Sequence, residues 1–505
     1  MTDLEAKIGR LLFLDVRGLT SAEAYPHVAE AWRHVARLGP GGAIFFGADA
    51  IQAHRFVAEH LRGLVVAADL ERGAAQQLAG ATEFPCPMAL AATGDPDLAR
   101  RVAAATAREA RAVGVNQIYA PVADVNVEPD NPIIATRAFG EDPDGTASFV
   151  AAAVRGIESE GVIATAKHFP GHGATRTDSH LELPVDDRPA DELRRSNLPP
   201  FAAAIRAGAR SVMVAHVAYQ ALSGEPGLPA TLCPRISTGL LRGELGFRGL
   251  AVTDAFNMKG LVARGEVEAA VLALEAGSDG IVHPMAPAEL VEGIARAVRS
   301  GRLGAARIDE AYERVIEATR DLPPQGSPSE LAGPEARELA ALAVSRSLAW
   351  LGRGAGRLPL EPRPRSLDLF LVADPDLSGV ATAFAETVGR RGADLATFRG
   401  AEGGRPGRPG LVAVFSAVRG GKGTAGPAGL GPEALSRLTS GPDRGRAVLF
   451  GSPWLHRWFA PETTTLVAWD SSLLAANLAA EALFGERTAP GRCPPSLEGR
   501  VGSSA

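Results

Sequence analysis

The chain has 505 residues, which is too long for one ordinary domain and predicts two. Its 46% hydrophobic and 22% charged residues are typical of a soluble globular protein. A formal net charge of −6 without a basic run argues against a nucleic-acid-binding surface. No segment has the roughly 18 apolar residues needed to cross a membrane.

The cysteines and the N-terminus indicate the cellular compartment. Cys86, Cys233 and Cys493 are odd in number and too widely spaced for a disulfide framework or a paired-cysteine metal site. The chain begins MTDLEAKIGRLLFLDV, whose acidic start and short apolar run differ from a secretory signal peptide. We therefore expect a cytoplasmic protein that binds neither nucleic acid nor membrane, and no feature indicates a cofactor. The oligomeric state is left open.

Short apolar runs alternate with longer, alanine-rich amphipathic stretches throughout residues 1–321, which predicts alternating strands and helices. Several runs are apolar throughout, as in parallel strands that are buried on both faces. Eight such strands predict an α/β fold with a (β/α)8 TIM-type barrel. The expected strands are Leu11–Val16, Ala43–Phe46, Leu64–Ala68, Gln117–Ala123, Val162–Lys167, Ser211–Ala215, Leu250–Thr253 and Gly280–His283.

A stretch rich in Pro, Gly and Ser follows at residues 322–334 (LPPQGSPSELAGP), and its composition predicts an interdomain linker. Residues 335–505 then predict a smaller α/β sandwich domain without a convincing catalytic residue, either structural or a lid near the barrel mouth. It would begin with a helix at Glu335–Trp350 and contain strands at Leu367–Val372, Leu411–Phe415, Ala447–Phe450 and Thr465–Trp469.

Polar residues follow five of the expected barrel strands, where active sites of such barrels are built. Because an isolated buried charge is costly, packing alone does not explain five such strand ends on one rim. The residues are Asp69 with Glu71, Asp124 with Asn126, Lys167 with His168, His216, and Asp254.

The segment KHFPGHGATRTDSH, residues 167–180, is the most informative part of the chain. Pro170 and Gly171 prevent His168 and His172 from sharing a helix face, so their spacing is not that of a helical zinc pair. No carboxylate or thiolate occurs in the loop before Asp178, so a metal is not expected. The alternative is a loop whose histidines cap backbone carbonyls, and we expect His172 to maintain the loop's shape.

The strongest catalytic candidates lie at the end of this segment and at the end of one later strand. Asp178 can accept a hydrogen bond from the ring of His180 and fix its tautomer, which suits a general acid and base. The alternative is a turn in which Asp178 binds the backbone. Asp254, in VTDAFNM, can attack an anomeric carbon. The alternative there is a helix N-cap.

Together these segments resemble glycoside hydrolase family 3, specifically its β-N-acetylglucosaminidase branch. The similar segments span nearly the whole chain in family order, and KHFPGHG followed by DSH is the most specific of them. They are GGAIFF (41–46), D-x-E (69–71), KHFPGHG (167–173), DSH (178–180), SVMVAHV (211–217), VTDAFNM (252–258) and, near the C-terminus, LFGERTAPGRCPPSL (483–497).

The resemblance implies a retaining exo-acting β-N-acetylglucosaminidase that cleaves a small carbohydrate, either an amino-sugar glycoside or a peptidoglycan fragment. It implies that Asp254 is the nucleophile and that His180 is the acid/base, oriented by Asp178. It also implies that sugar hydroxyls and the N-acetyl group are held by Asp69, Arg137, Lys167 and His168, with Arg137 in the segment ATRAFGEDP.

The chain departs from the family pattern at Gln77, because peptidoglycan-recycling members have a substrate-contacting arginine there. This leaves the exact substrate open. The alternatives are a β-glucosidase or broad β-hexosidase of the same family, phosphorolysis instead of hydrolysis, and a sugar-binding protein without turnover. A phosphate-binding barrel enzyme is disfavoured, because the segment after Gly280, IVHPMAPAEL, lacks a glycine-rich loop.

Overall fold

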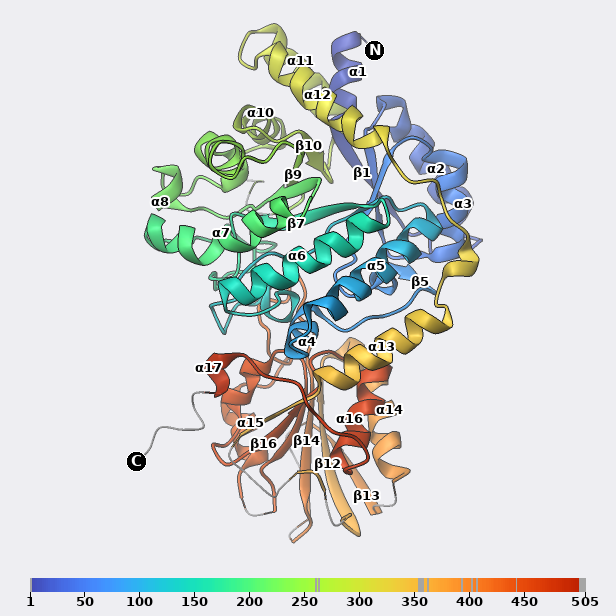
Figure 1. Ribbon diagram of the computed structural model, residues 1–505, viewed down its shortest axis with the longest axis vertical. Coiled ribbons are helices and arrows are strands. Elements are labelled where there is room, and N and C mark those ends of the chain that lie inside the picture. Colours follow the sequence, from blue (N-terminus) through green and yellow to red (C-terminus); the bar gives the residue numbers. More distant parts are fainter. Residues whose placement is uncertain are drawn as a thin grey trace. The chain divides into compact units, whose positions relative to one another are not determined.

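The computed structural model describes residues 2–258, 261, 264–352, 358–360, 363–391, 394–400, 403–405, 407–441 and 443–498. This part of the chain divides into two compact units (Figure 1). The barrel unit comprises Met1–Glu83, Ala99–Val125 and Asp142–Arg337. The sheet unit comprises Phe84–Leu98, Asn126–Glu141 and Glu338–Ala505.

The barrel unit is built on a closed barrel in the order β1-β10-β9-β8-β7-β6-β4-β2, with neighbouring strands parallel. All eight expected strands are confirmed. Strand β6 is shorter than expected, and beyond it Val122 forms only an isolated bridge with Lys167. The strands are β1 (Leu12–Arg17), β2 (Gly42–Phe46), β4 (Val65–Ala68), β6 (Gln117–Ile118), β7 (Ile163–Phe169), β8 (Ser211–Val214), β9 (Leu250–Ala255) and β10 (Gly280–Val282).

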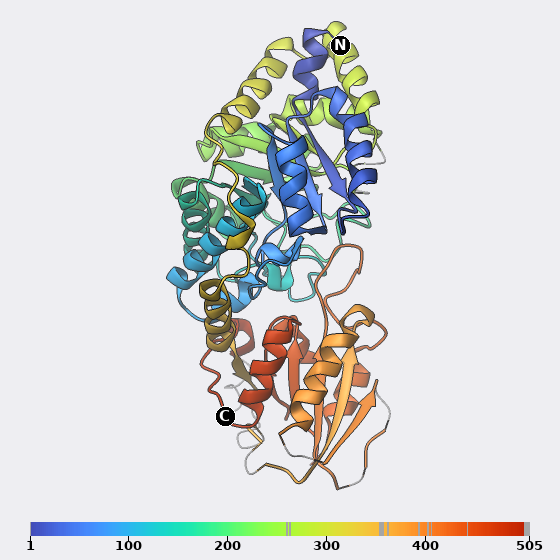
Figure 2. The ribbon, with the colours of Figure 1, turned by 90° about the vertical axis from the view of Figure 1, so that its right-hand side faces the viewer.

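Helices flank the barrel strands, as Figures 1 and 2 show. In α6 (Pro143–Ser159), Asp142 caps the first turn, and Phe149, Val150 and Val154 are buried. The other barrel-unit helices are α1 (Asp3–Gly9), α2 (Tyr25–Val35), α3 (Ala50–His60), α7 (Ala190–Arg206), α8 (Gln220–Ser223), the π-helix η5 (Arg235–Glu244), α10 (Glu266–Ala276), α11 (Pro287–Arg299) and α12 (Ala305–Arg320). Helix α5 (Pro96–Val113) has its first residues in the sheet unit. The short strands β3 (Ala48–Asp49) and β5 (Leu78–Ala79) pair with each other.

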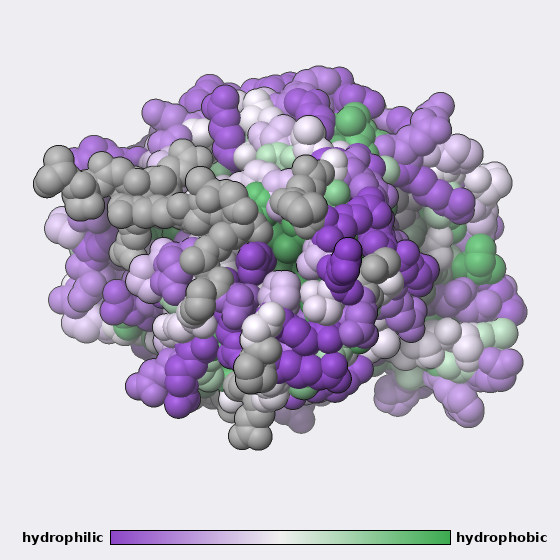
Figure 3. Space-filling model, turned by 90° about the horizontal axis from the view of Figure 1, so that it is seen from below, coloured by the Kyte–Doolittle hydropathy of each residue, from purple (hydrophilic) through white to green (hydrophobic). Residues whose placement is uncertain are grey.

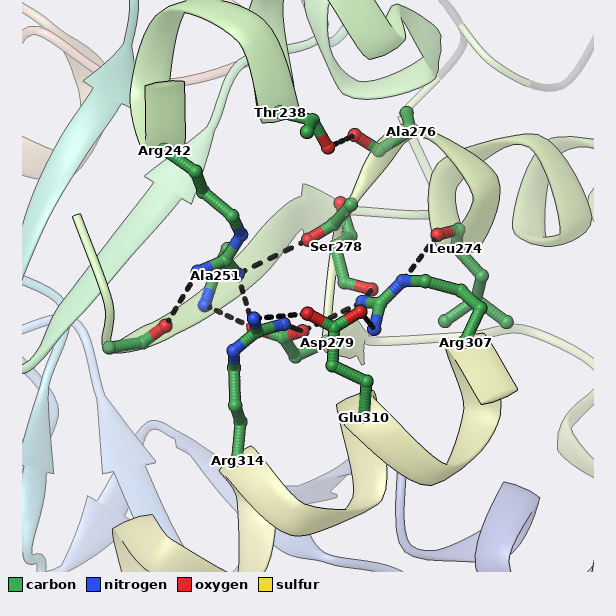
Figure 4. A network of polar contacts seen from close by, with 12 residues as sticks. Thr238, Arg242, Ala251, Leu274, Ala276, Ser278, Asp279, Arg307, Glu310 and Arg314 are labelled. Carbon is green, nitrogen blue, oxygen red and sulfur yellow. Dashed lines mark hydrogen bonds and ion pairs between the residues drawn. The ribbon is translucent and has the colours of Figure 1, made fainter. Parts of the chain in front are cut away.

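A buried carboxylate joins three arginines at the amino end of β10 (Figure 4). Asp279 is fully buried and accepts hydrogen bonds from Arg242 of η5 at 2.6 Å and from Arg307 and Arg314 of α12 at 2.7 and 2.9 Å. It also accepts one from the backbone N–H of Ala251, at 2.9 Å. One side chain thus ties η5 and α12 to strands β9 and β10, at the end of β10 opposite to the one where active sites form.

The segment predicted as a linker, residues 322–334, is hydrogen-bonded to the barrel unit over much of its length. Gln325 Nε2 donates to the carbonyls of His54 at 2.8 Å and Val113 at 3.2 Å. The N–H of Ala332 donates to the carboxylate of Glu109, which is buried and also binds Thr82. The segment is therefore fixed on the surface of the barrel unit.

The sheet unit contains a six-stranded sheet in the order β11-β16-β15-β14-β12-β13, parallel except for the β11–β16 pair. Its strands are β11 (Ala349–Leu351), β12 (Ser366–Ala373), β13 (Asp394–Arg399), β14 (Gly410–Phe415), β15 (Arg446–Phe450) and β16 (Thr464–Val467). Its helices are α4 (Pro87–Ala92), α14 (Ser378–Gly389), α15 (Pro432–Thr439), α16 (Leu473–Leu483) and α17 (Pro495–Glu498). Helix α13 (Pro334–Ser347) begins in the barrel unit.

Both faces of this sheet are covered, which explains the continuous apolar runs of its central strands. Leu369 and Leu371 of β12 pack in one core with α14 and α16. Phe370 and Val372 of the same strand pack in another core with α15. The outer surface of the molecule that Figure 3 shows is mainly hydrophilic outside the grey segments, and its hydrophobic residues lie in small separate areas.

The expected helix at Glu335–Trp350 is wrong at its end, because α13 stops at Ser347 and β11 begins two residues later. Trp350 pairs with Leu466 of β16 across an antiparallel ladder. An alanine-rich stretch favours helix, and only the partner strand more than a hundred residues later makes the segment extended.

Candidate active site

Lys167 and His168, at the end of β7, both engage carboxylates at the carboxyl ends of other barrel strands. The pairing of β7 with β8 is irregular between Ala166 and Phe169, so the strict alternation of side chains is interrupted there. Lys167 Nζ lies 2.5 Å from Asp69 Oδ1 and 2.6 Å from Glu71 Oε1, both beyond β4. The lysine side chain is 2% exposed, whereas that of Asp69 is 29% exposed. Lys167 therefore fixes a carboxylate that still faces solvent.

Asp124, which follows β6, binds both histidines of the KHFPGHG loop. Its Oδ2 lies 2.8 Å from Nδ1 of His168. Its Oδ1 accepts the backbone N–H of His172 at 2.7 Å. Asp124 is fully buried and His168 nearly so. A carboxylate on Nδ1 leaves Nε2 as the other polar atom of the His168 ring.

His172 is held inside this loop by hydrogen bonds. It is buried, its Nδ1 lies 2.7 Å from Thr175 Oγ1, and the Thr175 hydroxyl also approaches the His172 carbonyl at 3.1 Å. Burial, only partly opposed by the charge of Asp124, lowers the pKa of His172 from 6.5 to about 4. His172 is therefore neutral near pH 7.

Replacing His172 by asparagine is expected to make the fold less sensitive to acid. The folded state resists protonating a histidine whose pKa is about 4, while the unfolded chain takes up the proton below pH 6.5. Stability is thus lost as pH falls from 6.5 to 4, by about 3 kcal/mol for this group. Urea unfolding at pH 7.0 and 4.5 measures the loss. An equal loss in wild type and variant would contradict the assignment.

Asp178 and His180 form the expected pair. The carboxylate of Asp178 lies 3.0 Å from Nδ1 of His180 and accepts the His180 backbone N–H at 2.9 Å. Asp178 is buried, whereas the His180 side chain is 45% exposed. The pair therefore joins a fixed, buried carboxylate to an accessible ring, and a hydrogen bond at Nδ1 leaves Nε2 to exchange protons.

Asp254 lies at the end of β9 and accepts the backbone N–H of Ala255 at 2.8 Å. Burial alone would raise its pKa. The charges of His168 and His216, the Ala255 N–H and the charge of His180 outweigh burial and lower the pKa of Asp254 to about 2. The carboxylate is therefore ionised at neutral pH, as a nucleophile requires.

Two further polar side chains lie close to Asp254, and sequence reasoning gave neither a role. His216 follows β8 and is buried, and the charge of Asp254 partly opposes the lowering of its pKa by burial. Tyr119 follows β6. Burial, with the charges of Asp69 and Asp254, raises its pKa well above the ordinary value. Tyr119 gave no signal because tyrosine in an apolar run is usually core.

Two further residues from the sequence analysis have hydrogen bonds within their own units. Arg137 belongs to the sheet unit, where its guanidinium donates to the carbonyl of Ile133 at 2.9 Å. Its contact with a sugar stays a prediction. Gln77 uses its side-chain oxygen to accept the N–H of Gly47 at 2.9 Å. Gln77 thus supports the turn after β2.

Among the residues that the structure describes, no cluster of three or more His, Cys, Asp or Glu could hold a metal ion. None of the described helices could serve as a membrane span. The three cysteines are buried and unbridged. The sheet unit has an open groove of about 510 Å³, lined by Pro432, Glu433, Ser436, Arg437, Arg457, Trp458 and Phe459, which include no predicted site residue.

The barrel is closed and parallel, and its carboxylates and histidines gather at the carboxyl ends of the strands. This arrangement is typical of TIM-barrel enzymes, and two carboxyl-based catalytic groups are typical of glycosidases among them. Residues 43–318 match the model of the glycosyl hydrolase family 3 N terminal domain. The chain therefore belongs to glycoside hydrolase family 3.

Named relatives and a solved structure show similarity over long stretches. The chain is 33% identical over 362 residues to a β-N-acetylglucosaminidase/β-glucosidase of Cellulomonas fimi, covering 66% of this chain and 64% of that protein. It is 44% identical over 214 residues to a β-hexosaminidase of Stenotrophomonas maltophilia (strain K279a), covering 42% of this chain and 61% of the relative. The chain thus spans less than two thirds of the length of these two relatives.

The structure is similar to that of a family 3 β-N-acetylglucosaminidase from Paenibacillus sp. str. FPU-7. The two share 27% sequence identity with a TM-score of 0.82, over 97% of this chain and 98% of the other. The likeness therefore extends over both units, and the predicted (β/α)8 barrel followed by a smaller α/β domain is confirmed.

Proposed function

We propose that this protein is a retaining exo-acting β-N-acetylglucosaminidase. The observation that carries the proposal is the pairing of an exposed His180 with a buried Asp178, on the same barrel rim as the ionised Asp254. The names of the relatives in Cellulomonas and Stenotrophomonas support an acetamido sugar as substrate. Since one of those names also includes β-glucosidase, a glucoside is the second substrate to test.

In the proposed mechanism Asp254 attacks the anomeric carbon while Nε2 of His180 gives its proton to the leaving oxygen. A covalent glycosyl–Asp254 intermediate forms, and the leaving group departs as an alcohol. His180, now neutral, takes a proton from water as the water attacks the same carbon and the bond from that carbon to Asp254 breaks. Two displacements restore the original configuration. Asp178 keeps the ring in the tautomer that both steps need.

The remaining predicted residues would hold the sugar. Asp69 offers a partly exposed carboxylate, held in place by Lys167 and suited to accept hydroxyl hydrogen bonds. His168, oriented by Asp124, and Arg137 would donate to other sugar oxygens. In the same proposal the catalytic domain is residues 1–321, joined by residues 322–334 to a domain without catalytic residues.

Replacing His180 by alanine is expected to slow substrates according to their leaving group. A poor leaving group such as methanol needs the proton from His180 and should lose about 10³-fold in kcat/KM. 4-Nitrophenol leaves readily without a proton, so its cleavage should lose much less in that parameter. Steady-state kinetics with the two β-N-acetylglucosaminides provide the comparison. Equal losses would show that His180 is not the acid.

The substrate is tested with the purified protein and matched 4-nitrophenyl β-N-acetylglucosaminide and β-glucoside. A higher kcat/KM for the acetamido substrate supports the proposal, while a preference for glucose or an equal rate assigns a β-glucosidase or broad β-hexosidase. A parallel series with inorganic phosphate separates the acceptors, because phosphorolysis gives a sugar 1-phosphate instead of the free sugar. Binding of N-acetylglucosamine without turnover of either substrate would indicate a sugar-binding protein.

A further inference from the structure

His216 is a buried histidine whose ring is held on one side only. It is 1% exposed, and its Nδ1 lies 2.7 Å from Thr231 Oγ1. Among the residues that the structure describes, no atom forms a hydrogen bond with its Nε2, although this nitrogen is buried. A buried polar atom without a partner costs stability, so a site that retains one needs another explanation.

The contacts of Thr231 decide which ring nitrogen of His216 carries the proton. The Thr231 hydroxyl lies 2.8 Å from the carbonyl of Ala215 and 3.2 Å from that of Val214. Carbonyl oxygens only accept, so the single hydroxyl proton points to them and the hydroxyl oxygen accepts from His216 Nδ1. Nε2 of the neutral ring therefore carries a lone pair and requires a donor.

The His216 ring, which carries Nε2, lies close to Asp254, the proposed nucleophile. Val214 at the end of β8 pairs with Thr253 of β9, so His216, just beyond β8, lies next to the end of β9, where Asp254 is located. The His216 ring packs edge-to-face with that of Phe256, with centroids 5.9 Å apart. The His216 ring and the Asp254 carboxylate are close enough to interact electrostatically, so a donor that binds Nε2 would lie beside the nucleophile.

The chemistry of a bound sugar limits which group this donor can be. If Asp254 attacks the anomeric carbon, the two ring neighbours of that carbon are the ring oxygen and C2. The ring oxygen has no proton. C2 carries the N–H of an acetamido group or the O–H of a glucoside, and either one donates.

We propose that Nε2 of His216 accepts a hydrogen bond from the C2 substituent of the bound sugar. His216 is then a substrate-binding residue that requires a donor at C2, and Thr231 is a positioning residue that fixes its tautomer. The inference rests on the proposed function, with Asp254 as nucleophile.

The test compares His216→Phe with wild type on the 4-nitrophenyl β-N-acetylglucosaminide, β-glucoside and 2-deoxy-β-glucoside. Phenylalanine keeps the ring but removes the acceptor. We expect kcat/KM to fall about tenfold for the first two substrates and less than about twofold for the 2-deoxy substrate, which has no donor at C2. Thr231→Val should give the same pattern with a smaller fall, because it frees the ring to change tautomer.

A matched control is available in the sheet unit, where Nδ1 of His456 lies 2.9 Å from Thr465 Oγ1. His456→Phe should leave kcat/KM unchanged for all three substrates. An equal fall for all three substrates in both His216→Phe and Thr231→Val would overturn the inference and indicate a structural role. Failure of the proposed function is a separate result, seen as turnover that survives Asp254→Asn in the otherwise unchanged protein.

Discussion

Replacing Asp254 by asparagine is expected to reduce kcat/KM for the preferred 4-nitrophenyl glycoside by about 10⁴-fold or more, because no covalent intermediate can form. Asparagine keeps the size of the side chain and can still accept the Ala255 N–H. Because the pKa of Asp254 is lowered to about 2, loss of its charge also costs some stability, and we expect the melting temperature to fall by about 5 °C, too little to explain the loss of activity. Kinetics and thermal unfolding of the same preparations measure both quantities.

Mass spectrometry provides an independent check of the nucleophile. A 2-deoxy-2-fluoro glycoside with a good leaving group forms the intermediate faster than it is hydrolysed, so it should label wild-type protein once per chain. The labelled peptide should contain Asp254, and the Asp254→Asn variant should remain unlabelled. A label on another carboxylate would assign the nucleophile to that residue.

Replacing Asp279 by alanine is expected to lower the free energy of unfolding more than any other substitution proposed for this protein. Three arginines and the Ala251 N–H share this fully buried carboxylate, and its removal leaves positive charges without compensation inside the barrel unit. Removing one member of a buried ion pair costs about 3–5 kcal/mol. For a unit of this size we expect a melting temperature lower by about 6–10 °C.

Glu310 is the matched control, since it pairs with Arg307 and Arg314 of the same network but its side chain is 52% exposed. Glu310→Gln should lower the melting temperature by less than about 2 °C, because exposed ion pairs contribute little. Calorimetry of both variants tests the difference. Similar shifts would show that burial of Asp279 does not determine its contribution.

The barrel could be predicted from sequence because its strands are buried on both faces, so each forms an apolar run that needs no partner to be recognised. Strand β13, at the edge of the other sheet, has no buried residue, and its sequence, DLATFR, carries a weaker signal. Strand β11 depends on a distant partner. The strands that the sequence did not predict are therefore those whose conformation depends on pairing with distant strands.

The same distinction applies to the site. Asp178 and His180 are two residues apart, so their pairing could be predicted from sequence. Lys167 and Asp69 are 98 residues apart, and only the closed barrel brings them together. The roles of Glu71, Asp124 and His216 depend on such distant contacts. A sequence shows that these strand ends are polar but not which group each of them faces.

The hydrogen bonds of residues 322–334 have a consequence for truncation of the chain. A fragment that stops at Arg320, the last residue of α12, would lose Gln325 and leave the carbonyls of His54 and Val113 without their donor. It would also lose Ala332, the donor to the buried Glu109. A barrel expressed alone should therefore extend through Arg337, because the barrel unit includes this segment and ends after it.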